Sequence, residues 1–236
     1  MIKILGVIPA RGGSKGIPRK NLYPLAGYPL IYYSIFSAKK SRMLTEIIVT
    51  TDDEEIKDKS IEFGANVPFM RPPELSTDMA LAVPTIKHAV LEMERINNIV
   101  YDYVIMLQPT APLRTARHID ESLSYLISSD ADSIISVVDV DNNHPFKMKV
   151  IKDNLLFDYQ KSSLENPPRQ SLPKIYIVNG AIYATKRNTL INGNTFKGEK
   201  CLPYIMTEEY SVNIDNLRDF YVAEYYLKNY NNTEWI

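Results

Sequence analysis

The sequence has little cysteine and no long apolar run. Cys201 is the one cysteine among 236 residues, which excludes an intrachain disulfide and a cysteine-based zinc cluster within this sequence. No stretch of about 18 apolar residues is present, so a transmembrane helix is not expected. The N-terminus lacks the layout of a signal peptide, because its apolar stretch is short and Lys3 interrupts it. We therefore expect a cytoplasmic protein that does not associate with a membrane.

The sequence also lacks an excess of charge of either sign. Its 27 lysine and arginine residues nearly balance 28 aspartate and glutamate residues, giving a formal net charge of −1. This balance argues against a nucleic-acid partner, which needs a concentration of positive charge. Hydrophobic residues make up 45% of the chain, which is enough for an ordinary globular core. We expect residues 1–236 to form a single α/β domain with an appended arm.

A loop rich in glycine and cations follows the first apolar stretch. The stretch runs from Ile2 to Pro9 and predicts a buried strand, and the loop behind it reads RGGSKGIPRKN. Its three glycines let backbone N–H groups approach an anion closely, and its four cations can offset the charge. The loop is neither a Walker A motif nor a dinucleotide fingerprint, because the glycine spacing differs and Pro18 prevents direct entry into a helix. It indicates a polyphosphate site, with a mobile basic surface loop as the alternative.

Segments typical of strands and helices alternate in the first part of the chain. Strands are predicted at residues 2–9, 46–51, 67–70, 103–107 and 133–140, and helices at 29–40, 53–63, 83–96 and 116–128. This order predicts a three-layer, Rossmann-like and mostly parallel sheet with helices on both faces. Ligands of such sheets bind beyond the carboxyl ends of the strands. The loops after Ile8, Leu107 and Val140 are therefore the expected walls of the site.

The pattern changes at residues 142–173, which we interpret as a protruding arm. Residues 147–159 alternate weakly and predict a hairpin that turns at Asp153-Asn154. Because such arms often pair with another subunit, we expect a homodimer. The core is predicted to resume with strands at 175–184 and 211–214, followed by a closing helix at 216–230.

Four segments carry a resemblance to a known family. They are residues 8–22 (IPARGGSKGIPRKNL), 71–78 (RPPELSTD), 107–114 (LQPTAPLR) and 179–183 (NGAIY). Together they resemble the acylneuraminate cytidylyltransferases, or CMP-sialic acid synthetases. The resemblance implies the nucleotide-diphospho-sugar transferase type of fold. It also implies a reaction in which the anomeric hydroxyl of a nine-carbon keto-sugar acid attacks the α-phosphate of CTP. The products would be a CMP-sugar and pyrophosphate, and Mg²⁺ would be required.

The first loop would supply most of the nucleotide contacts. The residues expected to bind CTP are Arg11, Gly12, Gly13, Ser14, Lys15, Lys20, Asn21 and Arg71. Of these, Arg11, Lys15 and Lys20 can neutralise the triphosphate and stabilise the departing pyrophosphate, so we expect them to be catalytic. Ser14 and the glycine amides can donate to phosphate oxygens. The resemblance implies that Asn21 and Arg71 contact cytosine.

The acceptor sugar is expected on the other side of the site. Gln108 and Thr110 offer neutral polar groups to a polyhydroxylated sugar, and Arg169 is our candidate for its carboxylate. Tyr183 could contact the sugar, or could equally be a half-buried strand residue. The family often has an arginine at the position of Ile177, so this departure leaves the acceptor open among N-acylneuraminate, legionaminic acid and Kdo. Synthetases for Kdo have a metal-holding aspartate where this chain has Gln108, which favours a nine-carbon acid.

The metal site is a second departure from the family. The resemblance implies an Asp-Ile-Asp sequence before the last helix, where this chain has Asn213-Ile214-Asp215. In the predicted strand, residues 213 and 215 would share a face. Mg²⁺ binds through one or two carboxylates plus phosphate oxygens and water, so Asp215 is the expected anchor and Asn213 a doubtful one. Asp215 could instead cap the closing helix. A non-catalytic CTP-binding regulator is the alternative outside the enzyme class.

Overall fold

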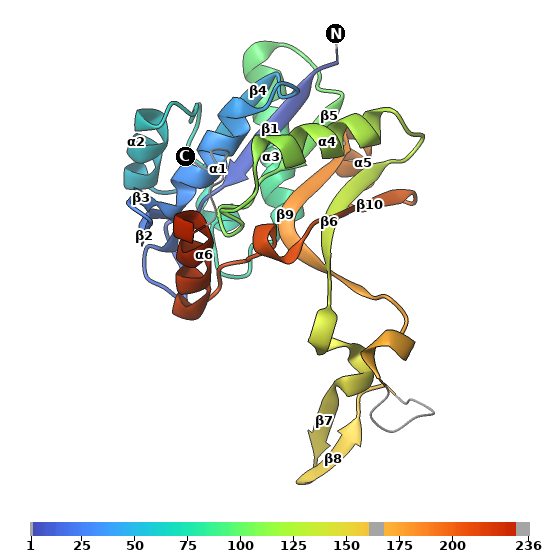
Figure 1. Ribbon diagram of the computed structural model, residues 1–236. Helices are drawn as coiled ribbons and strands as arrows, with labels where there is room; N and C mark the ends of the chain where they lie inside the picture. The colour runs from blue at the N-terminus through green and yellow to red at the C-terminus, as the bar shows by residue number, and fades with distance from the viewer. Residues whose placement is uncertain (1, 161–167, 230–236) are drawn as a thin grey trace.

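The protein folds around one six-stranded sheet with a long arm (Figure 1). The computed structural model describes residues 2–160 and 168–229, apart from the side chain of Arg169. The sheet strands are β1 (Ile4–Pro9), β4 (Glu46–Thr50), β5 (Tyr103–Met106), β6 (Ser133–Asp139), β9 (Tyr176–Lys186) and β10 (Cys201–Ile205). The α-helices are α1 (Leu30–Lys40), α2 (Glu54–Glu62), α3 (Ala82–Asn97), α4 (Ala116–Ile127), α5 (Arg187–Ile191) and α6 (Leu217–Asn229).

The sheet is mixed but mostly parallel, in the order β10-β6-β9-β5-β1-β4. β1 pairs in parallel with β4 and β5, and β10 pairs in parallel with β6. β9 runs antiparallel between β5 and β6. The predicted mostly parallel sheet is therefore confirmed, and the direction of β9 is the feature that the alternating pattern did not predict.

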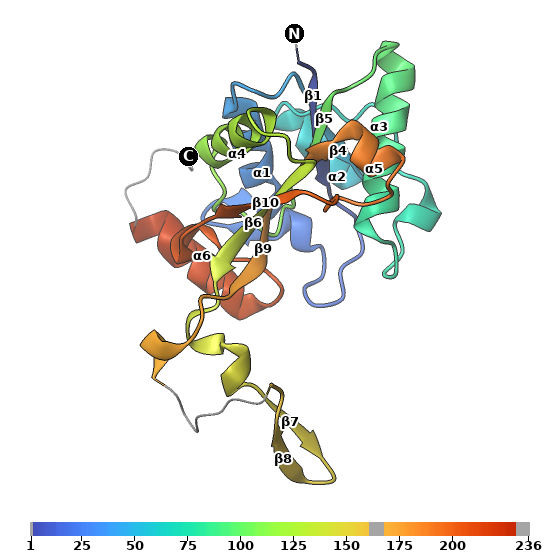
Figure 2. The ribbon, with the colours of Figure 1, turned by 90° about the vertical axis from the view of Figure 1, so that its right-hand side faces the viewer.

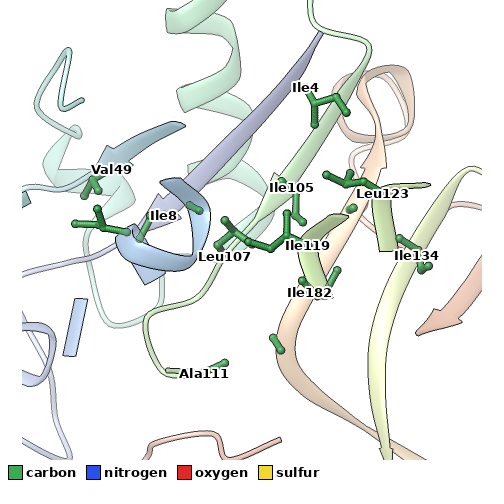
Figure 3. Close-up of a cluster of buried hydrophobic side chains, with 14 of the residues drawn as sticks. Ile4, Ile8, Val49, Ile105, Leu107, Ala111, Ile119, Leu123, Ile134 and Ile182 are labelled. Atoms are coloured by element: carbon green, nitrogen blue, oxygen red, sulfur yellow. The ribbon is translucent and has the colours of Figure 1, made fainter. Parts of the chain in front are cut away.

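Helices cover both faces of this sheet, as predicted. On one face, α1, α2 and α4 bury a cluster whose members include Ile8, Val49, Ile105, Ile119 and Leu123 (Figure 3). On the other face, α3 and α5 pack against β1, β4 and β5 through a second cluster. Both faces of the central strands are thus buried, which explains why these strands read as continuous apolar runs.

Two predicted strands are wrong. Residues 67–70 form no strand: Met70 makes an isolated bridge to Thr51, and Asn66, just before the segment, makes another to Ile48. Residues 211–214 also form no strand, because loop hydrogen bonds such as Ile214 N to Thr110 O (2.8 Å) hold them instead. The sixth strand is β10, which contains Pro203 and lies at the edge of the sheet, where a missing N–H is tolerated.

The arm leaves the sheet between β6 and β9 and projects away from it (Figures 1 and 2). It ends in the two-stranded hairpin of β7 (Lys149–Lys152) and β8 (Leu155–Asp158). Asp153 and Asn154 have φ of 50° and 62°, as a tight two-residue hairpin turn requires, so the predicted hairpin is confirmed. At the base of the arm, buried His144 makes a 3.1 Å contact with the carbonyl of Pro173.

The remaining regular elements are short. A small hairpin joins β2 (Pro24–Leu25) to β3 (Tyr28–Pro29) and packs beside α6. The 3-10 helices are Lys20–Leu22, Pro73–Leu75, Asp141–Asn143, Pro145–Lys147, Arg169–Ser171 and Glu208–Tyr210. Among the described residues, no helix is long and apolar enough to cross a membrane.

Candidate active site

A cleft of about 260 Å³ opens beyond the carboxyl ends of β1 and β5. Its polar lining consists of Arg11, Ser14, Lys20, Asn21, Arg71, Gln108 and Thr110, together with smaller residues of the segment before α3. The cleft therefore brings together residues from the first loop, from the segment between α2 and α3 and from the loop after β5. Two of the three predicted wall loops line it; the loop after Val140 leads instead into the arm.

The first loop lies close to the segment before α6. The Nζ of Lys20 donates to the carbonyl of Ile214 at 2.9 Å and lies 3.6 Å from the Oδ1 of Asp215. A Cβ added at Gly16 would come within 2.8 Å of the Asp215 carbonyl. Glycine is therefore required here for a close approach of two backbones, and that approach sets Lys20 beside Asp215.

Arg19, at the end of the loop, does not line the cleft. It has φ of 56° and forms ion pairs with Asp53 and Glu55, which belong to the N-terminal end of α2. Asp53 also caps α2 by accepting from the amide of Ile56 at 3.0 Å. The pairing raises the pKa of Arg19 and lowers the pKa of Asp53. We interpret Arg19 as an anchor for the loop.

Two other cations of the loop share one carboxylate, that of Asp78, to which the sequence pattern assigned no role. The Nη1 of Arg11 donates to the Oδ1 of Asp78 at 2.8 Å, and the Nζ of Lys15 lies 3.3 Å from the Oδ2. These pairs help to hold the pKa of Asp78 below its usual value. Lys15 is largely exposed, so the loop presents it near the cleft and not deep within it.

Arg71 is the most deeply buried cation of the cleft lining, with 6% of its surface exposed. Within the described residues, its Nε and Nη2 atoms are buried and make no hydrogen bond. Its nearest carboxylate is Asp52, whose Oδ1 lies 3.7 Å from Nη2 and also accepts from the Gly12 amide at 3.1 Å. Burial lowers the pKa of Arg71, and Asp52 partly offsets this. The Gly12 amide is thus engaged by Asp52 and not directed at a ligand here.

Asn21 has one half of its side chain engaged. Its Nδ2 donates to the carbonyl of Arg11 at 2.9 Å, which closes the loop on itself. The same amide group lines the cleft, so its oxygen is the part of the side chain that can face a ligand.

The loop after β5 is held in place by Arg114, a buried residue to which the sequence pattern assigned no role. Only 1% of Arg114 is exposed, and burial lowers its pKa to about 9. It donates to the carbonyls of Gln108 (3.2 Å) and Ala181 (3.1 Å) and to the hydroxyl of Ser34 (2.6 Å). Arg114 therefore joins the Gln108 loop to β9 and α1.

A turn within β9 faces the same loop. Gly180 has φ of 80°, and a Cβ added there would lie 2.9 Å from the Oε1 of Gln108 and 3.4 Å from the Oδ1 of Asn213. Both amide groups therefore lie beside the Gly180 backbone. Asn179 fixes this arrangement, because it accepts from Ser136 Oγ and donates to Ser211 Oγ at 2.8 Å.

The remaining sugar-side candidates lie elsewhere. Tyr183 does not line the cleft: it packs into the core beneath α3, with its ring centroid 6.0 Å from that of Phe196. Burial raises its pKa, and the packing interpretation replaces the predicted sugar contact. Arg169 starts a 3-10 helix of the arm, but its side chain is outside the described part of the structure. Ile177 is exposed near the base of the arm.

Asp215 is not the cap of the last helix. The cap is Asn216, whose Oδ1 accepts from the amide of Asp219 (3.3 Å) while Asp219 Oδ2 accepts from the amide of Asn216 (3.0 Å). The carboxylate of Asp215 is 74% exposed and faces Lys20. In the part of the chain that the structure describes, no group of three or more His, Cys, Asp or Glu side chains forms a metal site.

Comparison with known proteins gives consistent matches over almost the whole chain. Residues 5–225 match the family described as Cytidylyltransferase. The chain is 32% identical to post-translational flagellin modification protein B of Campylobacter coli over 98% of this chain and 97% of that protein. It is 32% identical to the CMP-N,N'-diacetyllegionaminic acid synthase of Legionella pneumophila, covering 94% and 95% of the two chains.

Two further matches differ in length or are structural. The N-acylneuraminate cytidylyltransferase of Streptococcus agalactiae serotype III is 34% identical over 93% of this chain, which spans 52% of that longer protein. A solved structure of CMP:2-keto-3-deoxy-manno-octonic acid synthetase complexed with CTP superposes with a TM-score of 0.71 at 19% identity, covering 95% of this chain and 98% of that one. The latter match shows a shared fold.

Proposed function

The chain belongs to the cytidylyltransferase family, and on that premise we propose that it activates a nonulosonic acid. It would transfer CMP from CTP to the anomeric hydroxyl of N-acylneuraminate or a close relative and release pyrophosphate. The observation that carries this proposal is the cleft itself, where the cationic first loop and the buried Arg71 face the Gln108 loop. We place the reaction in the cytoplasm, where CTP is available.

The two ends of the cleft suit the two ends of CTP. Arg11, Lys15 and Lys20 would neutralise the triphosphate, aided by Ser14 and the Gly13 amide. Arg71 and Asn21 would read cytosine: the guanidinium has buried donors without an acceptor, and the base offers a carbonyl oxygen and a ring nitrogen. A buried donor without a partner costs about 1–3 kcal/mol, so a bound base would relieve that cost.

The chemistry is an in-line displacement at the α-phosphorus. Such a reaction depends on positioning and charge neutralisation more than on a covalent protein nucleophile. The Nζ of Lys20, in the first loop, lies 3.6 Å from the Oδ1 of Asp215, so Lys20 is placed to stabilise negative charge that develops as pyrophosphate leaves.

The donor set fits Mg²⁺ held mainly by phosphate. Asp215 supplies one exposed carboxylate beside Lys20, and Asn213 supplies at most a neutral amide oxygen. Mg²⁺ commonly binds in this way, with one carboxylate plus phosphate oxygens and water. When bound with CTP, the ion would polarise the phosphate oxygens. We propose Asp215 as its protein ligand.

The acceptor would lie against Gln108 and Thr110. Their amide and hydroxyl groups can bond a polyhydroxylated sugar, and Arg169 remains our candidate for its carboxylate. N-acylneuraminate, legionaminic acid and Kdo all carry that carboxylate, and relatives or structural neighbours are named for each. Gln108, in place of a metal-holding aspartate, favours a nine-carbon acid over Kdo.

An acceptor panel tests the proposal. CTP and Mg²⁺ are incubated with each sugar acid in turn, and released pyrophosphate is measured. We expect release with a nine-carbon acid and none with CTP alone. Binding of CTP with no pyrophosphate from any acceptor would instead support the regulator alternative.

We further propose that the arm joins two copies of the chain. Its hairpin exposes apolar side chains on both faces: Ile151 and Leu156 are cross-strand partners, as are Val150 and Phe157 one position along. Ile151 is 74% exposed and Leu156 66%. An isolated two-stranded hairpin with this surface is poorly stable in water, and a second copy would cover it.

Light scattering tests this assembly. The unaltered protein is expected to be a dimer, and Leu156→Asp is expected to shift it to the monomer. Lys152→Glu changes charge on the same hairpin without adding a charge to an apolar position, so it serves as the control. A monomeric unaltered protein would contradict the proposal.

A further inference from the structure

One carboxylate occupies two of the cations that would receive the triphosphate. Asp78 accepts from Arg11 at 2.8 Å through Oδ1 and lies 3.3 Å from Lys15 through Oδ2. Asp78 belongs to the segment before α3, and Thr77 and Ala80 on either side of it line the cleft. Its two contacts therefore tie that wall of the cleft to the first loop, which forms the facing wall.

The ion pairs of Asp78 with Arg11 and Lys15 are exposed, so a ligand anion can replace Asp78 in them. The side chains of Arg11, Lys15 and Asp78 are 32%, 74% and 41% exposed. Ion pairs exposed to this degree are weak, because water and salt screen them. A polyphosphate carries several charged oxygens and would compete well for both cations.

The pairs of Arg19 provide a contrast within the same loop. Arg19 bonds both oxygens of Asp53 and also Glu55, and it does not line the cleft. Its partners are set on α2, where Asp53 is also the helix cap. The loop thus has one anchored cation, Arg19, and two cations whose shared carboxylate partner is exposed and can be replaced by a ligand anion.

We propose that Asp78 is a built-in competing anion that sets the affinity of the site for polyphosphate. The inference rests on the proposed function. CTP and pyrophosphate would displace the carboxylate from Arg11 and Lys15, whereas CMP, which has no β- and γ-phosphates, would leave it in place. After CMP transfer, Asp78 returns to the two cations and favours the release of pyrophosphate. It is a specificity-determining residue for the polyphosphate end of the ligand.

The test compares Asp78→Asn with the unaltered protein by titration calorimetry in EDTA. The probes are inorganic pyrophosphate, CTP and CMP. We expect pyrophosphate and CTP to bind about fivefold more tightly to the variant, as the loss of a weak competing ion pair predicts. CMP affinity should not change. In turnover, pyrophosphate should inhibit the variant more strongly as a product.

Asp130→Asn is the matched control. It removes the same charge from an exposed aspartate that pairs with Lys200 and does not line the cleft. It should leave the affinities for pyrophosphate, CTP and CMP unchanged. If both variants bound pyrophosphate more tightly by the same factor, the cause would be a general electrostatic effect, and the inference would be overturned.

Other outcomes also decide the matter. Unchanged or weaker pyrophosphate binding by Asp78→Asn overturns the inference, and weaker binding only with Mg²⁺ present would make Asp78 a metal ligand instead. Because pyrophosphate alone is a sufficient probe, the test does not depend on the donor being CTP. Failure of the proposed function has a different signature: the unaltered protein would not bind CTP, or would release no pyrophosphate with any acceptor.

Discussion

Replacement of Arg71 should affect folding and CTP binding very differently. Its guanidinium is buried, yet two of its nitrogens make no hydrogen bond within the described structure, and its nearest carboxylate is 3.7 Å away. A buried donor without a partner costs about 1–3 kcal/mol. Arg71→Met keeps a side chain of similar length and removes those donors. We expect its free energy of unfolding to stay within about 1 kcal/mol of the unaltered protein.

Binding should show the opposite behaviour. A hydrogen bond to a charged donor contributes about 1.5–3 kcal/mol, so CTP affinity should fall about 10- to 150-fold. Denaturant unfolding and calorimetric titration with CTP measure the two quantities on the same preparation. The change lies in the cytosine contact, so pyrophosphate affinity should remain the same.

Arg114→Met is the matched control, because Arg114 is also buried, but both of its terminal nitrogens are hydrogen-bonded and only its Nε lacks a partner among the described residues. It donates to Gln108, Ala181 and Ser34. Its loss removes three hydrogen bonds made by a buried charged donor, so it should cost at least about 3 kcal/mol of stability. The reasoning is refuted if Arg71→Met destabilises the protein as much as Arg114→Met and leaves CTP affinity unchanged.

Further predictions concern the loop, the metal and pH. Gly16→Ala places a Cβ 2.8 Å from the Asp215 carbonyl, whereas Gly13→Ala has nothing within 4 Å; we expect kcat to fall at least about tenfold in the first and to change little in the second. Asp215→Asn should raise the Mg²⁺ concentration needed for half-maximal turnover and leave thermal unfolding unchanged, and an unchanged Mg²⁺ dependence would remove Asp215 from the metal site. Burial lowers the pKa of His118 to about 3. His118 therefore takes up a proton near pH 6.5 in the unfolded chain and only near pH 3 in the folded protein. The free energy of unfolding is therefore unaffected by His118 above pH 6.5 and falls as the pH drops toward 3. At pH 5 the decrease should be about 2 kcal/mol. His118 belongs to the capping box of α4, where its Nδ1 accepts from the amide of Thr115 at 3.1 Å. Denaturant unfolding of His118→Gln should lack the loss at low pH, since glutamine can keep the capping box.

Much of the fold and part of the site follow from local sequence. The first loop and the Gln108 loop were predictable because each follows an apolar strand, and parallel strands bring their carboxyl ends to one edge. The strand predicted at 211–214 failed because apolar alternation over a few residues cannot distinguish a strand from a loop that is bonded elsewhere. β10 was missed because Pro203 argues against a strand unless its edge position is known.

The electrostatic partners could not be predicted. Arg11 and Asp78 are 67 positions apart, and Gly12 and Asp52 are 40 apart. Only the packing of the first loop against β4 and the segment before α3 brings them together. Tyr183 could not be assigned either. Alternation along a strand does not say which face of the sheet a side chain occupies, and the structure shows that the ring packs under α3.

The transfer of the α-phosphorus tests the account most directly. CTP labelled at the α-phosphorus, and in a parallel sample at the γ-phosphorus, is incubated with the protein, Mg²⁺ and a nine-carbon keto-sugar acid, and the labelled products are separated. The account predicts α-label in the CMP-sugar, γ-label in pyrophosphate, and neither product when the acid is omitted. Label in inorganic phosphate and CDP, or unchanged CTP with every acceptor, would contradict it.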